Sequence, residues 1–263
     1  SRLCSLMGKE RRPVTIGTFH GIYYGILRWT YRIGQKNLLS DNEKYQILRQ
    51  VIRHQKLEIF DEGNFLKDIA SEIGKIKNQR IGPEGFISEK CEAAVFRQIY
   101  RAHEEQRKRR RKMDFDDMLV LCFQLFLSRP DVLKGWQKKF RYILIDEFQD
   151  INLLQYQVVR MLAAPENNLF IVGDDDQSIY RFCGAKPEIM LQFPKAYPDV
   201  HKIILDYNFR CPGNVVKAAA KVIGRNVMRY DKQIREVKGE GEPIEFLKFP
   251  NQNQESLFIM KRI

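Results

Sequence analysis

Two short polar segments hold residues whose types and spacing are suited to chemistry on phosphates. The first, residues 146–150, reads Asp-Glu-Phe-Gln-Asp and follows an apolar run. In such a pair one carboxylate could hold a magnesium ion that bridges phosphates, and its neighbour could orient and deprotonate an attacking water. The structural alternative is a charged strand end at which Asp150 or Asn152 caps the next helix. The acidic pair alone favours that alternative.

The second segment, residues 172–185, reads V-G-D-D-D-Q-S-I-Y-R-F-C-G-A and is more specific. Gly173 permits a tight turn, and the neutral amide of Gln177 could contact a terminal phosphate or a water. Tyr180 and Phe182 lie close to this polar stretch, as aromatic rings that stack on unpaired bases would. The alternative is that both rings belong to the core. For Phe182 that alternative is weaker, because arginine and cysteine flank it in place of an apolar run.

Two more polar clusters also follow short apolar runs. Thr18 and His20 come after residues 14–16, and residues 208–210 come after residues 203–205. In open α/β sheets, ligands bind outside the carboxyl ends of the strands. With the two segments above, four such clusters therefore predict one shared site.

The elements that would position these clusters read as a parallel sheet. Residues 142–145, 169–172 and 203–205 are apolar runs without alternation, which is typical of strands buried on both faces. Residues 153–162 and 187–193 lie between them and have helical patterns. Alternation of this kind predicts an α/β fold.

The region between these parts, residues 29–112, is helical and polar in pattern. Ser40 and Glu43 form a capping box ahead of an apolar helical stripe. A second long helix is expected from Ser88 into the basic run at residues 107–112. The basic run could bind the phosphates of duplex DNA, or it could be a solvated helix face; we weigh these alternatives equally.

Composition sets broad limits on the class of protein. The 263 residues are 44% hydrophobic and carry a net charge of +12, which is typical of a globular chain and favours polyanionic partners without identifying one. The five cysteines are scattered and form no C-x-x-C pair, which favours reduced thiols and a cytoplasmic location. No apolar run is long enough to span a bilayer, so we expect no membrane partner.

The motifs together resemble those of UvrD/Rep/PcrA-type superfamily 1 DNA helicases. Residues 146–150 resemble motif II, residues 172–185 resemble motif III, and Leu-x-x-Asn-Phe-Arg at residues 205–210 resembles motif IV. Residues 18–21 (T-F-H-G) and 114–119 (D-F-D-D-M-L) resemble two further family segments. The order and spacing agree from about residue 3 to residue 225.

The resemblance implies ATP and Mg²⁺ as cofactors. Asp146 would bind the metal through water, Glu147 would be the general base and Gln177 would sense the γ-phosphate. The remaining nucleotide-binding residues would be Asn208, Phe209, which would stack on adenine, and Arg210, which would reach the γ-phosphate and act in catalysis.

The resemblance also implies single-stranded DNA and duplex junctions as partners, with accessory proteins unknown. Thr18, Phe19 and His20 would contact the DNA, and Phe182 with Tyr180 would stack on bases. In the basic run, the DNA-binding residues would be Arg109, Arg110 and Arg111.

The implied fold is a RecA-like parallel sheet with an inserted α-helical subdomain. Residues 1–28 and 113–207 would form the first RecA-like domain, and residues 29–112 the insertion. Residues 208–263 would begin a second RecA-like domain.

The sequence departs from the family in two ways. Cys183 occupies a position where motif III usually has arginine, and no G-x-x-x-x-G-K-[ST] loop occurs. That loop is expected upstream of Ser1, and motifs V and VI beyond Ile263, so the isolated chain should be inactive. One hypothesis is a fragment of an ATP-dependent helicase that moves 3′ to 5′ on single-stranded DNA. The other is a catalytically dead DNA-binding or interaction protein derived from one.

Overall fold

The computed structural model describes residues 14–263, except residues 56, 58, 80 and 180–183. The chain divides into two compact units, residues 1–192 and residues 193–263. The helices of the first unit are α2 (Phe19–Tyr31), η1 (Gln35–Asn37), α3 (Asp41–His54), α4 (Glu62–Gln79), α5 (Ala93–Arg109), α6 (Phe115–Ser128), α7 (Pro130–Lys139), η2 (Phe148–Asp150), α8 (Leu153–Ala163) and η3 (Asp175–Gln177). A further helix, α9 (Pro187–Ala196), crosses the boundary between the units.

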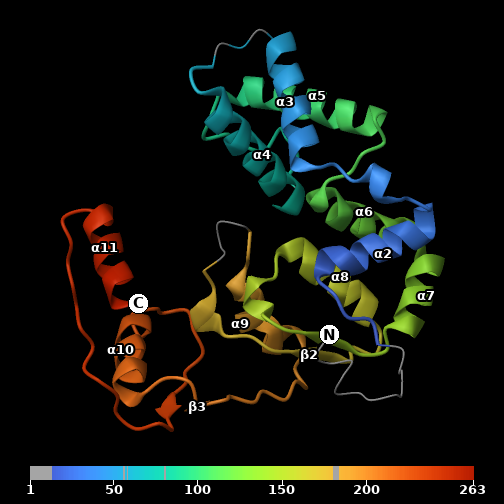
Figure 1. Cartoon of the computed structure of the whole chain (residues 1–263). Helices are drawn as coiled ribbons and strands as arrows, with labels where there is room; N and C mark the ends of the chain where they lie inside the picture. Colours follow the sequence, from blue (N-terminus) through green and yellow to red (C-terminus); the bar gives the residue numbers. More distant parts are fainter. Residues whose placement is uncertain (1–13, 56, 58, 80, 180–183) are drawn as a thin grey trace. The chain divides into compact units, whose positions relative to one another are not determined.

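The first hydrophobic core is built around α6, which packs with α2, α7 and α8 (Figure 1). The sequence of α6 is apolar at almost every position after its first turn, as expected for a helix that is covered on most sides. Asp114 caps its N-terminus, because the Asp117 amide donates to Asp114 Oδ1 at 2.8 Å and the Asp114 amide donates to Asp117 Oδ2 at 2.9 Å.

A parallel pair of strands lies beside this core. Strand β1 (Ile143–Ile145) pairs with β2 (Leu169–Ile171), with Ile145 opposite Ile171, and α8 makes the crossover between them. This confirms the two strands predicted in this region. The prediction that both faces are buried is wrong for them, since Leu144 is 71% exposed and Phe170 is 59% exposed.

Two other predicted strands are absent from the described residues. Residues 14–16 and 203–205 are extended but are not paired to any described strand, and their apolar side chains are largely exposed. A strand is defined by hydrogen bonds to a neighbour, and an apolar run supplies only the side chains. In the second case the pairing begins later, at β3 (Tyr207–Asn208).

The second hydrophobic core of the first unit lies among α3, α4 and α5. Ser40 and Glu43 form the predicted capping box at the start of α3, with the Ser40 amide 2.9 Å from Glu43 Oε2. The helix predicted from Ser88 starts at Ala93 instead. The segment that was expected to form the first helical turn is non-helical. There Ser88 Oγ donates to Glu72 and accepts from the Cys91 amide.

A buried cluster of charges joins α4, α5 and α6. Lys77 Nζ lies 2.9 Å from Glu104, 3.1 Å from Asp114 and 2.9 Å from Asp117, and Arg107 lies 3.1 Å from Asp117. The cluster fixes the start of α6 against α4 and α5, because each cation bridges carboxylates from different elements.

The second unit has little regular structure besides two helices, α10 (Gly213–Ile223) and α11 (Gln252–Arg262). Strand β3 pairs in parallel with β4 (Arg235–Glu236), and the Gly213 amide at the start of α10 donates to the Gly239 carbonyl at 2.6 Å. This arrangement leaves residues 209–212 in the short connection between β3 and α10.

Candidate functional site

The carboxyl ends of β1 and β2 bring the two polar segments of the first unit together. Because the strands are parallel and in register, the chain leaves both at the same edge. The Val172 amide donates to the Ile145 carbonyl and the Phe148 amide donates to the Val172 carbonyl, each at 2.8 Å. These backbone hydrogen bonds continue past the ends of the strands. They hold the turn at residues 146–150 against the loop at residues 173–177.

The acidic pair remains at the surface of this edge. Asp146 and Glu147 are both exposed, and Asp146 Oδ1 accepts a hydrogen bond from the Glu147 amide at 3.0 Å. The cap of α8 is Asn152, whose side chain accepts from the Gln155 amide at 2.8 Å. The capping alternative thus holds for Asn152, and it leaves the two carboxylates at the strand end available for another role.

Glu147 has an unusual backbone conformation, with φ 52° and ψ 43° in the left-handed region. This conformation is uncommon for a residue other than glycine and costs free energy, so it persists only where the surroundings impose it. Here it turns the chain sharply from β1 into η2.

Buried Gln149 links this turn to the loop after β2. Its Nε2 donates to Glu147 Oε2 at 2.7 Å, and its Oε1 accepts from the Asp174 amide at 3.0 Å. Asp174 Oδ2 in turn accepts from Gln177 Nε2 at 2.7 Å. Sequence reasoning missed Gln149, because its link to Asp174 depends on the pairing of β1 with β2 and no local sequence signal marks it.

Oxygen ligands dominate this edge, which fits a hard cation such as Mg²⁺. Besides the acidic pair, the carboxylates of Asp174, Asp175 and Asp176 lie within 4.8 Å of one another. Another acidic side chain, Asp150 in the turn after β1, has its pKa raised by burial and by the charge of Glu147.

The Thr18–His20 segment begins α2. Thr18 Oγ1 caps the helix by accepting from the Gly21 amide at 3.2 Å, and Phe19 packs against Tyr23 at the edge of the first core. His20 is half-buried, and this burial lowers its pKa although the charge of Asp116 opposes the shift.

Phe115 was not predicted as a site residue, yet its ring is 60% exposed and contacts the His20 imidazole edge-on. A large exposed ring at the first position of an otherwise buried helix could have been noted from the D-F-D-D sequence. Tyr180 and Phe182, the aromatic residues predicted for stacking, lie outside the described residues, as does Cys183.

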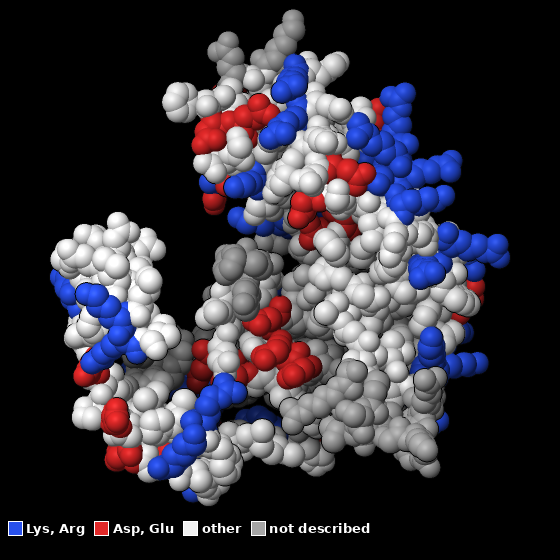
Figure 2. Space-filling model, in the orientation of Figure 1, with Lys and Arg blue, Asp and Glu red and all other residues white. Residues whose placement is uncertain are grey.

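The basic run divides into structural and exposed residues. Arg107 is buried in the charge cluster, and Lys112 pairs with Glu43 at 2.7 Å. The four residues between them are exposed at the C-terminal end of α5, where Lys and Arg side chains gather (Figure 2). Arg110 also donates to Gln50 of α3 at 2.8 Å.

The predicted motif IV residues form a local turn in the second unit. Asn208 Oδ1 accepts from the amides of Arg210 and Cys211 at 2.9 and 2.8 Å, which closes an Asx turn. The turn presents Phe209, 69% exposed, and Arg210 to solvent. Asn208 therefore has a structural task in shaping this turn.

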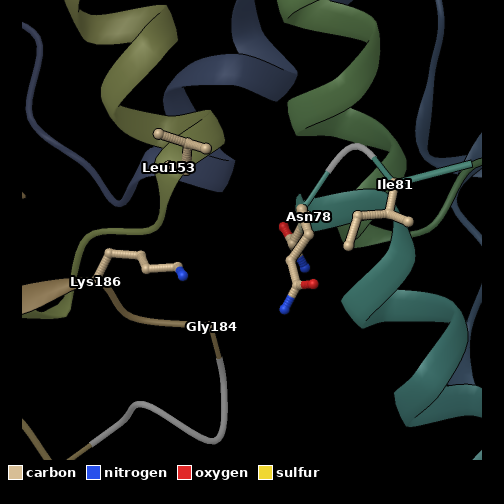
Figure 3. A pocket seen from close by; sticks show the side chains of 6 residues that line it. Asn78, Ile81, Leu153, Gly184 and Lys186 are labelled. Carbon is tan, nitrogen blue, oxygen red and sulfur yellow. The ribbon is translucent and has the colours of Figure 1, made fainter. Parts of the chain in front are cut away.

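A cavity of about 210 Å³ lies where α4 ends beside α8. Leu153 and Lys186 line one side and Asn78 and Ile81 the other (Figure 3). Asn78 Nδ2 donates to Asp116 at 2.7 Å. The same side chain accepts from Asn152 Nδ2 at 3.2 Å, so it links the second core to the start of α8.

Comparison with known families gives two matches along the chain. Residues 1–198 match the UvrD/REP helicase N-terminal domain, and residues 203–263 match the UvrD-like helicase C-terminal domain. Within the described part of the chain, no helix is both long and apolar enough to cross a membrane.

Curated relatives resemble the chain over almost its whole length. The "Putative ATP-dependent DNA helicase YjcD" of Bacillus subtilis is 36% identical over 95% of the chain. The ATP-dependent DNA helicases PcrA of Leuconostoc citreum and of Staphylococcus aureus are 32% and 30% identical over 100% of it. The chain spans 33% of YjcD and 36% of each of these PcrA proteins.

Proposed function

The chain belongs to the UvrD/REP helicase family, and we propose that the gene product containing it is an ATP-dependent DNA helicase. ATP hydrolysis drives its movement, 3′ to 5′, along single-stranded DNA. The observation that carries the proposal lies at the carboxyl ends of β1 and β2, where hydrogen bonds join the segments that follow the two strands. There a surface acidic pair is tied by hydrogen bonds to the loop of Gln177.

At the carboxyl ends of β1 and β2, each residue has a separate role in phosphoryl transfer. The Asp146 carboxylate would hold Mg²⁺, which would neutralise charge on the phosphates, and Glu147 orients and deprotonates the attacking water. Gln177 senses the γ-phosphate. For the motif IV turn of the second unit we propose that Phe209 stacks on adenine and that Arg210 contacts the γ-phosphate, and Asn208 shapes that turn.

Two surfaces of the first unit bind DNA. The start of α2 contacts the strand through Thr18, Phe19 and His20, next to the exposed ring of Phe115. Arg109, Arg110 and Arg111 bind phosphates of the duplex at a junction, supported by their exposure at the end of α5. Tyr180 and Phe182, which lie outside the described residues, are proposed to stack on bases of the single strand.

The fold that serves these sites is a RecA-like domain interrupted by a helical subdomain. We propose residues 29–112 as the insertion, since α3, α4 and α5 have a core of their own. We propose that residues 208–263 begin a second RecA-like domain; a separate compact unit supports a second domain here, although that unit begins earlier, at Phe193.

The test is hydrolysis of ATP by the gene product with and without single-stranded DNA. Wild-type protein should show DNA-stimulated turnover, and Glu147→Gln should lower kcat by at least about 100-fold, within the range expected of general-base catalysis. The matched control is Glu166→Gln, which changes an exposed glutamate between α8 and β2 and should leave kcat unchanged. Equal turnover in Glu147→Gln and wild type would refute the proposal.

A further inference from the structure

We propose that Gln149 is the positioning residue that couples the general base to the γ-phosphate sensor in the helicase reaction. The inference rests on the proposed function, because it takes Glu147 as the base and Gln177 as the sensor. Gln149 itself touches neither substrate nor metal in this role. It acts through two neighbours, one on each of the two polar segments.

The chemistry at position 149 requires an amide. Glu147 presents a carboxylate oxygen, which only accepts, and Asp174 presents a backbone N–H, which only donates. An uncharged side chain that donates at one atom and accepts at another satisfies both at once. Glutamate would satisfy the N–H but repel the carboxylate, and an aliphatic residue would satisfy neither.

The position of this amide is closely fixed. Gln149 is 2% exposed, so water cannot easily replace either of its partners. Beside the same Oε1 atom lies Gly173, where an added Cβ would be 2.6 Å from Gln149 Oε1 and 3.1 Å from the Phe148 amide nitrogen. Glycine thus lets the loop approach Gln149 closely, and the close approach leaves the amide little room to move.

The hydrogen bonds form a continuous path between the two proposed roles. From Glu147 the path runs through the Gln149 amide to the backbone of Asp174, and from the Asp174 carboxylate to Gln177 Nε2. The backbone N–H of Gln177 also donates to the Asp174 carbonyl at 2.9 Å, which holds Gln177 and Asp174 together a second time. Displacement of Gln177 on contact with a phosphate therefore shifts Asp174, and through Gln149 it shifts the carboxylate of Glu147.

The consequence is an effect on the rate of the chemical step and little effect on nucleotide binding. Groups that orient a reacting residue typically change activity by about 10–100-fold when removed. Because the side-chain hydrogen bonds of Gln149 join the base to the sensor loop, its loss should lower kcat while KM for ATP stays within about threefold.

The experiment compares Gln149→Leu and Gln149→Glu in the gene product, measuring kcat and KM for ATP with saturating single-stranded DNA. Gln149→Glu keeps an acceptor for the Asp174 amide and loses the donor to Glu147, so a folding defect in Gln149→Leu does not decide the outcome. The matched control is Gln137→Leu, which removes a part-buried glutamine whose Nε2 donates to the Met161 carbonyl at 2.8 Å. Melting temperatures of all variants monitor folding.

We expect both Gln149 variants to lose about 10–100-fold in kcat, with KM nearly unchanged and with Gln137→Leu close to wild type. Glu147→Gln is measured alongside to separate the two claims. If it is inactive while Gln149→Glu keeps wild-type kcat, the coupling role is overturned and the proposed function stands. If Glu147→Gln is fully active, both are overturned.

Discussion

The imidazole of His20 packs edge-on against the ring of Phe115, with centroids 5.5 Å apart and planes inclined at 87°. The two residues are almost a hundred positions apart in sequence and begin helices α2 and α6. Their contact places an exposed aromatic face beside the segment proposed to bind DNA.

Phe115→Ala should weaken binding of single-stranded DNA. Base–aromatic stacking is worth roughly 1–3 kcal/mol per base, so the dissociation constant should rise by about 5–150-fold. Stacking releases no counterions, so the dependence of affinity on salt should stay the same. Fluorescence anisotropy with a labelled oligonucleotide across a salt titration measures both. The control is Phe60→Ala, which removes a fully exposed ring between α3 and α4. Equal losses in both variants would contradict a specific role for Phe115.

His20 should contact DNA as a neutral hydrogen-bonding group at neutral pH. Burial lowers its pKa below the ordinary histidine value, although Asp116 opposes the shift. A lowered pKa means that the ring gains its charge only below that ordinary value, near pH 6.5. His20→Ala should therefore leave the salt slope of DNA binding unchanged at pH 7.5. A slope that becomes flatter by about 0.7, the value for one phosphate on a single strand, would show a charged histidine instead.

The exposed arginines at the end of α5 should control the salt dependence. Replacing Arg109, Arg110 and Arg111 with alanine should flatten the slope by up to about 0.9 for each phosphate lost on duplex DNA. Arg107→Ala is the informative contrast, since Arg107 is buried against Glu104 and Asp117. It should lower the melting temperature and leave the slope unchanged. A salt titration and a thermal melt measure both effects. A flatter slope in Arg107→Ala together with an unchanged slope in the triple variant would contradict this assignment of exposed and buried residues.

Lys77→Met should destabilise the first unit by about 3–5 kcal/mol, because it leaves buried carboxylates without their shared cation. Burial alone would raise the pKa of Glu104, but His103, Arg107 and Lys77 hold it well below its usual range. A depressed pKa contributes stability above the ordinary glutamate value, near pH 4.3, and that contribution is lost as the pH falls below it.

Denaturation between pH 7 and pH 3 measures this effect. Wild-type protein should lose stability below about pH 4.3. Lys77→Met should show a smaller loss, because without the lysine the pKa of Glu104 is lowered less. The control is Lys67→Met, which changes an exposed lysine on the same helix and should behave as wild type. Equal stability of Lys77→Met and wild type at pH 7 would contradict the role of the cluster.

The sequence was informative where local chemistry determines local structure. The capping box at Ser40 and Glu43, the strands at residues 143–145 and 169–171, and the helix that begins at Leu153 were all predictable, because each depends on neighbouring residues. Residues 14–16 and 203–205 were wrongly predicted as strands, because pairing depends on a partner that composition does not reveal.

Long-range contacts account for what the sequence could not show. Lys77 looks like any helical lysine until α5 and α6 bring three carboxylates around it. The link from Gln149 to Asp174 likewise depends on the register of β1 and β2. The acidic pair was found from its place after a strand, whereas the residue that holds it required the fold.

Strand displacement tests the central claim most directly. The gene product is incubated with ATP, Mg²⁺ and a labelled duplex that carries either a 3′ or a 5′ single-stranded tail. We predict displacement of the strand from the 3′-tailed duplex, dependent on ATP and absent in Glu147→Gln. Binding of both duplexes without ATP-dependent displacement of either would contradict the account and would indicate a DNA-binding protein without helicase activity.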